Sequence, residues 1–545
     1  MKIVYVAQAI LLFLLMASPS FAKDIYIAQN SAGANTGADC ADAHAASWFN
    51  TATNWGTGST QIGPGTTAHL CGTFTGAANS TLLTFQGSGT SGSPITLWFE
   101  SGAVVQAPYF AAAAGGSAGG GISMDGRSYI VIDGNNKTGT VQNSLNGASG
   151  ATCPGGACNV QATSTLIDLQ NCTNCTVQNL NLGPTYIEVQ NVNSENSTNE
   201  VAIAISGVNN ILANNAITNC GWCVNFFYNN NDTNFQAYGN TFSNFGHAFA
   251  LAPGGSTNAC TSPCSIIHDN RIGPAGLSWD ASGCPNHKDG IHYFGSGSTS
   301  SMADTYIYNN WFGGDWGLCP TGFIYTDNVD PHITSWYMWN NVFQVVNTAF
   351  ENTNGWVEIS AGGSGGNQES FNNTFMGPGS TNNAVAFAHF SNPNLRVVGN
   401  VITGIDNPML ISSSTVTQVD YNLYGTTVCA NYGNCFSWNG SFEGSLSGWK
   451  TACACDAHSI SNATPGLNSD GSLQSTSVAR SASLNLSSYV SGHLATLQND
   501  TTDGGIRTST ARPTGTTLWD VGAFMSGVTA APSPSAPTNV IATPK

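Results

Sequence analysis

The tripeptide Asn310-Trp311-Phe312 recurs in altered form along the chain, as an asparagine followed two positions later by an apolar residue. Seven copies form this column: Asn215-Ala216-Ile217, Asn240-Thr241-Phe242, Asn270-Arg271-Ile272, Asn310-Trp311-Phe312, Asn341-Val342-Phe343, Asn373-Thr374-Phe375 and Asn400-Val401-Ile402. Successive asparagines are 25, 30, 40, 31, 32 and 27 residues apart. A bounded but irregular period of this length is typical of one supersecondary unit per repeat, with insertions in one loop.

Short runs of β-branched and aromatic residues alternate with Gly, Asn and Ser clusters, which predicts an all-β chain. Two short strands per repeat cannot bury an apolar face alone, so we expect the repeats to stack as the coils of a parallel β-helix. The apolar residues of the column would form one inward ladder, and the turn asparagines would pair with neighbouring coils. A second predicted ladder comes from the residues Phe249, Ile291, Phe323 and Phe350.

Three further segments accompany the asparagine turns: GTSGSPIT at 89–96, YIVIDG at 129–134 and WDVGAF at 519–524. With these segments the chain resembles the right-handed parallel β-helix proteins of the pectate-lyase-like superfamily over most of its length. The resemblance implies an all-β, right-handed parallel β-helix with loop insertions. The superfamily includes polysaccharide lyases, glycoside hydrolases, uronate epimerases and noncatalytic adhesins, so the resemblance leaves the chemistry open.

The N-terminus predicts secretion, because Lys2 precedes the apolar run 10–16 and small residues follow at 20–22. We therefore expect a signal peptide at 1–22, whose apolar core is too short to span a bilayer. The predicted divisions of the remaining chain are 23–160 for the N-terminal cap and first coils, 161–425 for the central coils, 426–525 for a cysteine-rich insertion and last coil, and 526–545 for a Pro/Ser-rich tail.

The composition bounds the partners of the protein. A net charge of −17 argues against nucleic-acid binding, and it would repel a polyanionic substrate unless a cation lies between the two. We expect a monomer that acts on a polysaccharide and does not insert into a membrane. Sixteen cysteines in an exported chain predict disulfides, mostly between close neighbours such as Cys172 and Cys175, and Cys284 with Cys319 would brace the candidate site.

The stretch 284–327 concentrates unusual chemistry in a chain of which only 8% is charged. Strand alternation places His292 and Glu351 on one outward face, with Asp289 at the mouth of the strand. The predicted catalytic residues are Asp289, His292, Glu351, His287, Lys288 and Asp327. The predicted substrate-binding residues are Trp279, Trp311, Trp316, Asp315, Arg271 and Tyr325, since flat aromatic faces stack on sugar rings.

Three functions remain open. Hydrolysis needs two carboxyl groups, which Asp289 and Glu351, Asp315 or Asp327 would supply without a cofactor. The lyase alternative needs a base, Lys288 or His292, and a stabilising cation, Arg271 or a Ca2+ ion held by Asp280, Asp289 and Asp315. A noncatalytic glycan-binding protein would use the same aromatic residues. We lean toward hydrolysis because the chain is acidic and has few cations.

Alternation also disfavours a transition-metal site in this stretch. It places His292 and Gly290 on one face of the strand and Asp289 on the other, so one strand would not present all the ligands together. The scattered histidines His247, His268, His332 and His389 are expected in turns or at the surface.

Overall fold

The computed structural model describes residues 23–113, 118–146, 162–186, 200–228, 233–253, 261–275, 287–293, 304–317, 320–326, 335–345, 355–360, 367–379, 385–390, 394–412, 416–425 and 435–527. The predicted signal peptide lies outside these residues. Among the described residues, no helix has the length and apolar character needed to cross a membrane.

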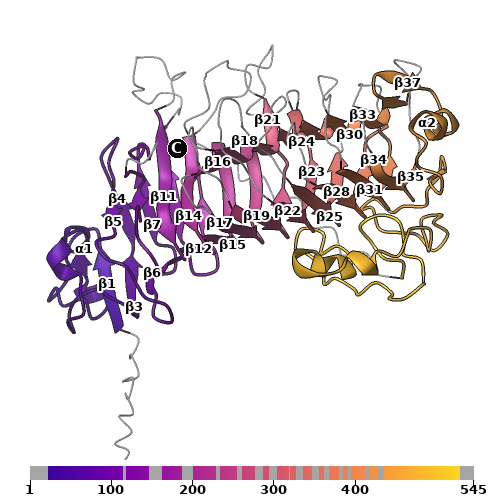
Figure 1. The fold of residues 1–545 in the computed structure, drawn as a ribbon. Coiled ribbons are helices and arrows are strands. Elements are labelled where there is room, and N and C mark those ends of the chain that lie inside the picture. The colour runs from indigo at the N-terminus through magenta and orange to yellow at the C-terminus, as the bar shows by residue number, and fades with distance from the viewer. Residues whose placement is uncertain are drawn as a thin grey trace, which may run out of the picture.

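The strands stack in three files that run the length of the molecule (Figure 1). File I carries the candidate site and consists of β5 (Leu83–Thr84), β8 (Ile122–Ser123), β11 (Ser164–Thr173), β14 (Glu200–Val208), the second halves of β16 (Ala216–Tyr228) and β18 (Thr241–Pro253), β21 (Lys288–Tyr293), β24 (Pro320–Thr326), β27 (Gly355–Ser360), β30 (Val385–Phe390), β33 (Asn407–Ser412) and β36 (Phe436–Trp438). Every pairing within this file is parallel.

Two further parallel files complete each coil. File II consists of β1 (Lys23–Ala28), β3 (Thr66–Cys71), β6 (Ile95–Phe99), β9 (Ile130–Asp133), β12 (Thr176–Gln178), β15 (Ile211–Ala213), β17 (Thr233–Tyr238), β19 (Thr261–His268), β22 (Thr305–Tyr308), β25 (Trp336–Trp339), β28 (Asn367–Phe371), β31 (Asn394–Val398) and β34 (Val416–Asp420). File III consists of β4 (Thr73–Thr75), β7 (Val104–Ala107), β10 (Thr140–Asn143), β13 (Asn181–Leu182), the first halves of β16 and β18, β20 (Arg271–Ile272), β23 (Trp311–Gly314), β26 (Val342–Val345), β29 (Thr374–Met376), β32 (Val401–Thr403), β35 (Leu423–Tyr424) and β38 (Ile460–Ser461).

The remaining elements are short and lie at the ends of the solenoid or, for the last two 3-10 turns, along its flank. They are β2 (His44–Ala45), β37 (Ser441–Glu443), α1 (Ala46–Phe49), α2 (Leu446–Cys453) and the 3-10 turns Cys40–Asp42, Ala52–Asn54, Ser487–Tyr489 and Gly492–Gln498. The C-terminal segment, yellow in Figure 1, returns along the flank of the solenoid beside β25. There Asn340 donates a side-chain hydrogen bond to the carbonyl of Asn499 at 2.8 Å. The predicted all-β parallel β-helix is confirmed.

The asparagine column forms the predicted ladder at the turns between files II and III. The Nδ2 atom of Asn310 donates to Asn341 Oδ1 at 3.1 Å and to the carbonyl of Ile267 at 2.9 Å. Its Oδ1 atom accepts from the backbone and side-chain nitrogens of Asn270, each at 3.0 Å. The same pattern links Asn215, Asn240, Asn270, Asn310, Asn341, Asn373, Asn400 and Asn422, all of them buried. Each amide thus satisfies backbone groups that a tight turn would leave without partners.

The apolar residues of the column form the first predicted inward ladder. Ile217, Phe242, Ile272, Phe312, Phe343 and Phe375 pair in register across six coils. The second predicted ladder was wrong by one residue: Ile291 pairs with Ile324, not with Phe323. The reason is a register shift between Lys288 and Asp289, which moves β24 by one position relative to β21. Phe350 lies outside the described residues.

Disulfides join Cys40 to Cys71, Cys220 to Cys223 and Cys453 to Cys455. The predicted local pair Cys172 and Cys175 is not bonded; both are free cysteines in the core. Their thiols donate to backbone carbonyls instead, Cys172 to Met124 and Cys175 to Arg127. The predicted Cys284–Cys319 bridge lies outside the described residues.

Candidate functional site

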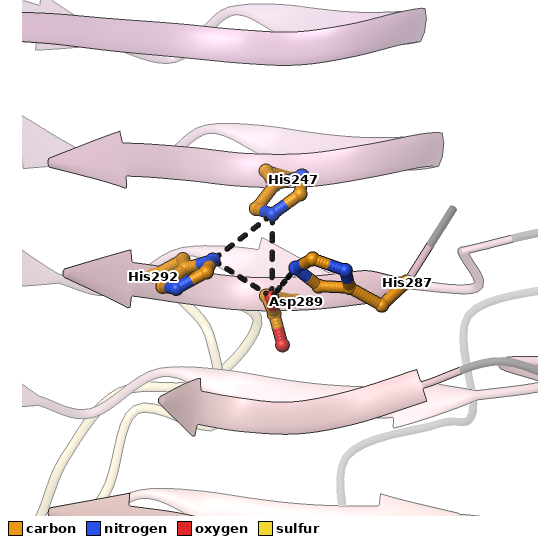
Figure 2. Close-up of side chains that lie close together, drawn as sticks. All are labelled: His247, His287, Asp289 and His292. Atoms are coloured by element: carbon orange, nitrogen blue, oxygen red, sulfur yellow. Dashed lines mark hydrogen bonds and ion pairs between the residues drawn. The ribbon is translucent and has the colours of Figure 1, made fainter. Parts of the chain in front are cut away.

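Three histidine side chains from two neighbouring coils converge on one oxygen of the Asp289 carboxylate (Figure 2). The Oδ2 atom of Asp289 lies 3.0 Å from His292 Nδ1, 3.3 Å from His247 Nε2 and 3.4 Å from His287 Nε2. His247 Nε2 and His292 Nδ1 lie 3.0 Å from each other. We refer to His247, His287, Asp289 and His292 as the histidine cluster.

Strand register positions the cluster. His247 on β18 pairs directly with Asp289 on β21, and Ala250 pairs with His292 three residues further along. Because adjacent strands lie about 4.8 Å apart, side chains at these paired positions are within reach of one another. His287 approaches from the residue just before β21, as Figure 2 shows.

The sequence argument against such a cluster was wrong. It assumed that strict alternation would separate Asp289 from His292, yet the two side chains meet at 3.0 Å. β21 departs from regular pairing at its start, where the register shifts between Lys288 and Asp289, and all six of its residues are buried. The usual alternation of side chains between the two faces of a strand therefore does not predict on which face each residue of β21 lies.

Burial differs sharply within the cluster. The side chains of Asp289, His292 and His247 are 0%, 1% and 6% exposed, whereas that of His287 is 46% exposed. Solvent and any bound molecule therefore reach the cluster from the side of His287. The three buried members lie behind it.

The protonation states follow from this burial. Burial lowers the pKa of His247 to about 4, although the adjacent Asp289 carboxylate opposes the shift. Burial tends to raise the pKa of Asp289, but the charge of His292 and the close contacts with His292 and His247 outweigh it and hold that pKa well below its usual range. Asp289 is thus a carboxylate and His247 a neutral imidazole near neutral pH.

The carboxylate is oriented by its second oxygen. Asp289 Oδ1 accepts a hydrogen bond from the backbone nitrogen of Gly322 at 3.0 Å, which ties the cluster to β24. Aromatic rings flank the histidines along file I: Trp222 lies 5.6 Å from the His247 ring, and Tyr325 lies 5.0 Å from the His292 ring. Both rings are partly exposed.

Gly290, between Asp289 and His292, is required by close packing. A Cβ atom there would lie 2.4 Å from the carbonyl oxygen of Phe323 and 3.0 Å from the Phe312 ring. Gly290→Ala is therefore expected to destabilise the protein by about 1–3 kcal/mol and to shift the cluster. Chemical denaturation measures this loss. The control is Gly87→Ala, whose Cβ would meet only the Trp55 ring at 3.2 Å; an equal, small effect at both sites would contradict the packing argument.

Lys288 and Trp316, which were predicted as site residues, are both buried. Lys288 is fully buried, and its ammonium donates to the carbonyl of Trp316 at 2.8 Å. Trp316 is also fully buried, against Phe245 and Phe323. Asp315 accepts a hydrogen bond from the Gly317 backbone at 2.9 Å, as a turn residue does.

Arg271 and Trp311 contact the C-terminal segment. The Arg271 guanidinium stacks 4.0 Å above the Trp311 ring and donates to the carbonyl of Asp503 at 3.0 Å. Among the predicted substrate-binding residues that the structure describes, Tyr325 contacts the histidine cluster, through the ring of His292. Trp279, Asp280, Asp327 and Glu351 lie outside the described residues, so their predicted roles stay predictions.

His247 is the site residue that sequence reasoning missed, since it was expected in a turn or at the surface. A signal was present, because GHAF at 246–249 and KDGI at 288–291 occupy the same column and align His247 with Asp289. The prediction that His292, Ile324 and Glu351 occupy equivalent positions on successive coils was also wrong. His292 pairs with Tyr325, and Tyr325 pairs with Glu358. The register shift at Asp289 accounts for the change from Ile324 to Tyr325.

Calcium does not fit the cluster. Ca2+ prefers six to eight oxygen ligands, whereas this site offers one carboxylate and three imidazoles. Of the predicted calcium ligands, Asp289 is in contact with histidines and Asp315 with a turn amide, and Asp280 lies outside the described residues.

No protein-family model matches the sequence, and no curated protein matches it. Among solved structures, the fold is similar to pectate lyase Pel9A, with 13% sequence identity, 93% of this chain and 98% of that chain covered, and a TM-score of 0.40. It is similar to a mannuronic acid-specific polysaccharide family 6 lyase from human gut microbiota, with 14% identity, 70% and 79% coverage, and a TM-score of 0.36. It is also similar to the tailspike protein of E. coli bacteriophage HK620 in complex with a pentasaccharide, with 10% identity, 69% and 72% coverage, and a TM-score of 0.36.

Proposed function

We propose that the protein is a secreted enzyme that cleaves an extracellular polysaccharide by β-elimination at a uronic acid, with His287 as the base. The observation that carries this proposal is the pairing of an exposed imidazole, His287, with the buried carboxylate of Asp289 at 3.4 Å. A base held by an orienting carboxylate is the arrangement that proton abstraction requires. The pairing lies at the solvent side of the only histidine cluster found among the described residues.

The surroundings suit a sugar chain. Trp222 on β16 and Tyr325 on β24 lie on the coils on either side of the cluster, and partly exposed aromatic rings offer flat apolar faces for sugar rings. The parallel coils extend this face along the molecule (Figure 1), which suits a polymer better than a small molecule. The sequence resemblance to polysaccharide-acting β-helix proteins points the same way.

Elimination is favoured over hydrolysis by the state of Asp289. A hydrolase needs one carboxyl group that stays protonated to act as the general acid. The side chain of Asp289 is fully buried behind His287, and its Oδ2 atom faces three imidazole nitrogens. It is therefore suited to orienting a base and unsuited to protonating a leaving oxygen.

The proposed reaction uses the two nitrogens of His287 differently. Nε2–H faces Asp289 Oδ2, so the lone pair of Nδ1 is available to take the proton next to the uronate carboxylate. The electron pair of the broken C–H bond moves toward that carboxylate, and the C–O bond to the neighbouring sugar then breaks. Water gives a proton to the leaving oxygen and the imidazolium later returns its proton to water, so the products are an unsaturated uronate and a new sugar hydroxyl. Asp289 stabilises the imidazolium that forms.

A panel of uronic-acid and neutral polysaccharides tests this proposal. We expect the absorbance of unsaturated uronates to rise with the polyuronates and with no neutral polymer. New reducing ends without that absorbance would instead indicate hydrolysis, and binding without any cleavage would indicate a glycan-binding protein. Either result would overturn the elimination proposal.

A further inference from the structure

The three buried atoms of the histidine cluster cannot all be satisfied by protons. His247 Nε2, His292 Nδ1 and Asp289 Oδ2 form a closed triangle with edges of 3.0, 3.0 and 3.3 Å. If both nitrogens carry protons, the two N–H groups face each other at 3.0 Å. If either nitrogen lacks a proton, its lone pair faces the carboxylate oxygen or the lone pair of the other nitrogen.

With Asp289 as a carboxylate, each of these arrangements leaves one repulsive contact inside the triangle, among side chains that are at most 6% exposed. Asp289 Oδ2 reflects this conflict: it is buried, and it accepts no hydrogen bond of ordinary geometry from the described residues although three imidazole nitrogens surround it. A buried group of this kind needs an explanation, and an ion is a common one. A cation above the triangle would turn all three contacts into favourable ones.

The triangle has the dimensions of a metal-binding face. Three atoms bound about 2.1 Å from one ion lie roughly 3.0 Å apart in octahedral geometry and roughly 3.4 Å apart in tetrahedral geometry. The observed edges of 3.0–3.3 Å fall in this range. The hydrogen bond from the Gly322 amide to Asp289 Oδ1 supplies the outer contact that orients a ligating carboxylate.

We propose that His247 Nε2, Asp289 Oδ2 and His292 Nδ1 bind a divalent first-row transition ion such as Zn2+, with open positions facing His287 and solvent. Two imidazoles and one carboxylate suit such an ion and suit neither Ca2+ nor Mg2+, which prefer oxygen ligands. Binding of the ion does not depend on the proposed function; only the role of the ion in catalysis rests on it. In that role, a cation at this site would hold the uronate carboxylate and stabilise the enolate. It would also offset the repulsion between an acidic substrate and a chain with a net charge of −17.

Metal binding is tested on the full chain without substrate. The protein is stripped with a chelator, titrated with Zn2+ by calorimetry, and loaded with Co2+ for visible absorption, which reports the ligand field directly. We expect one equivalent of bound ion in the wild type. We expect His247→Gln and Asp289→Asn each to weaken binding by at least about 100-fold, because each removes one of three ligands.

Two variants serve as controls. His268→Gln changes a histidine that also contacts a carboxylate, Asp269, and is stacked on Tyr308 in file II; its binding should equal that of the wild type. His287→Gln should retain the ion. The proposal is overturned by less than half an equivalent in the wild type, by unchanged binding in the ligand variants despite a native circular dichroism spectrum, or by loss of the ion in His287→Gln. Failure of the polyuronate assay alone would contradict the proposed function and leave this result standing.

Discussion

Replacement of Asn310 by alanine is expected to lower the free energy of unfolding by about 3–5 kcal/mol. Asn310 stands in the middle of the asparagine ladder and is fully buried. Its loss leaves the carbonyl of Ile267, the amide oxygen of Asn341 and the nitrogens of Asn270 each short of a partner. A buried polar group without a partner costs about 1–3 kcal/mol, and water cannot replace the amide without opening the turn.

Urea denaturation followed by circular dichroism measures this effect. The matched control is Gln142→Ala, which removes another amide contact between coils, the 3.0 Å bond to Gln106, at a partly exposed position. The control should lose less than about 1 kcal/mol, because water satisfies exposed amides. A loss at Asn310 no larger than at Gln142 would contradict the view that the ladder holds the coils together.

The asparagine column was sufficient to predict the solenoid. Each asparagine makes the same hydrogen bonds at the same turn, so the motif stays recognisable even where insertions lengthen another part of the coil. The apolar residue two positions after each asparagine must point inward. The ladder from Ile217 to Phe375 was therefore predictable residue by residue. File I was less predictable, because its strands follow loops of variable length and carry no residue with a fixed role.

The candidate site could be predicted in part. Asp289, His287 and His292 stood out because titratable residues are rare in this chain, and the structure brings their side chains together although the alternation argument had separated Asp289 from His292. Their arrangement could not be derived, because a single register shift at Asp289 cancels the alternation rule on which the argument depended. His247 belonged to the same column as Asp289, but only the pairing of β18 with β21 reveals the contact.

Replacement of His287 by glutamine is expected to reduce turnover of a polyuronate by about 10²–10⁴-fold, the range for loss of a general base. Glutamine keeps the size and polarity of the side chain but cannot accept and carry a proton at neutral pH. Because His287 is 46% exposed, the fold should tolerate the change. Binding of the polysaccharide should be retained, since the rings of Trp222 and Tyr325 are unchanged. His268→Gln is the matched control and should keep the turnover of the wild type.

The most direct measurement is the initial rate at which wild-type protein and His287→Gln form unsaturated uronate, recorded by absorbance at saturating polyuronate. The account predicts steady product formation by the wild type and a rate at least about 100-fold lower for the variant, with equal affinity for the polymer. Equal rates for the two proteins would contradict the claim that the exposed imidazole of the histidine cluster removes the proton.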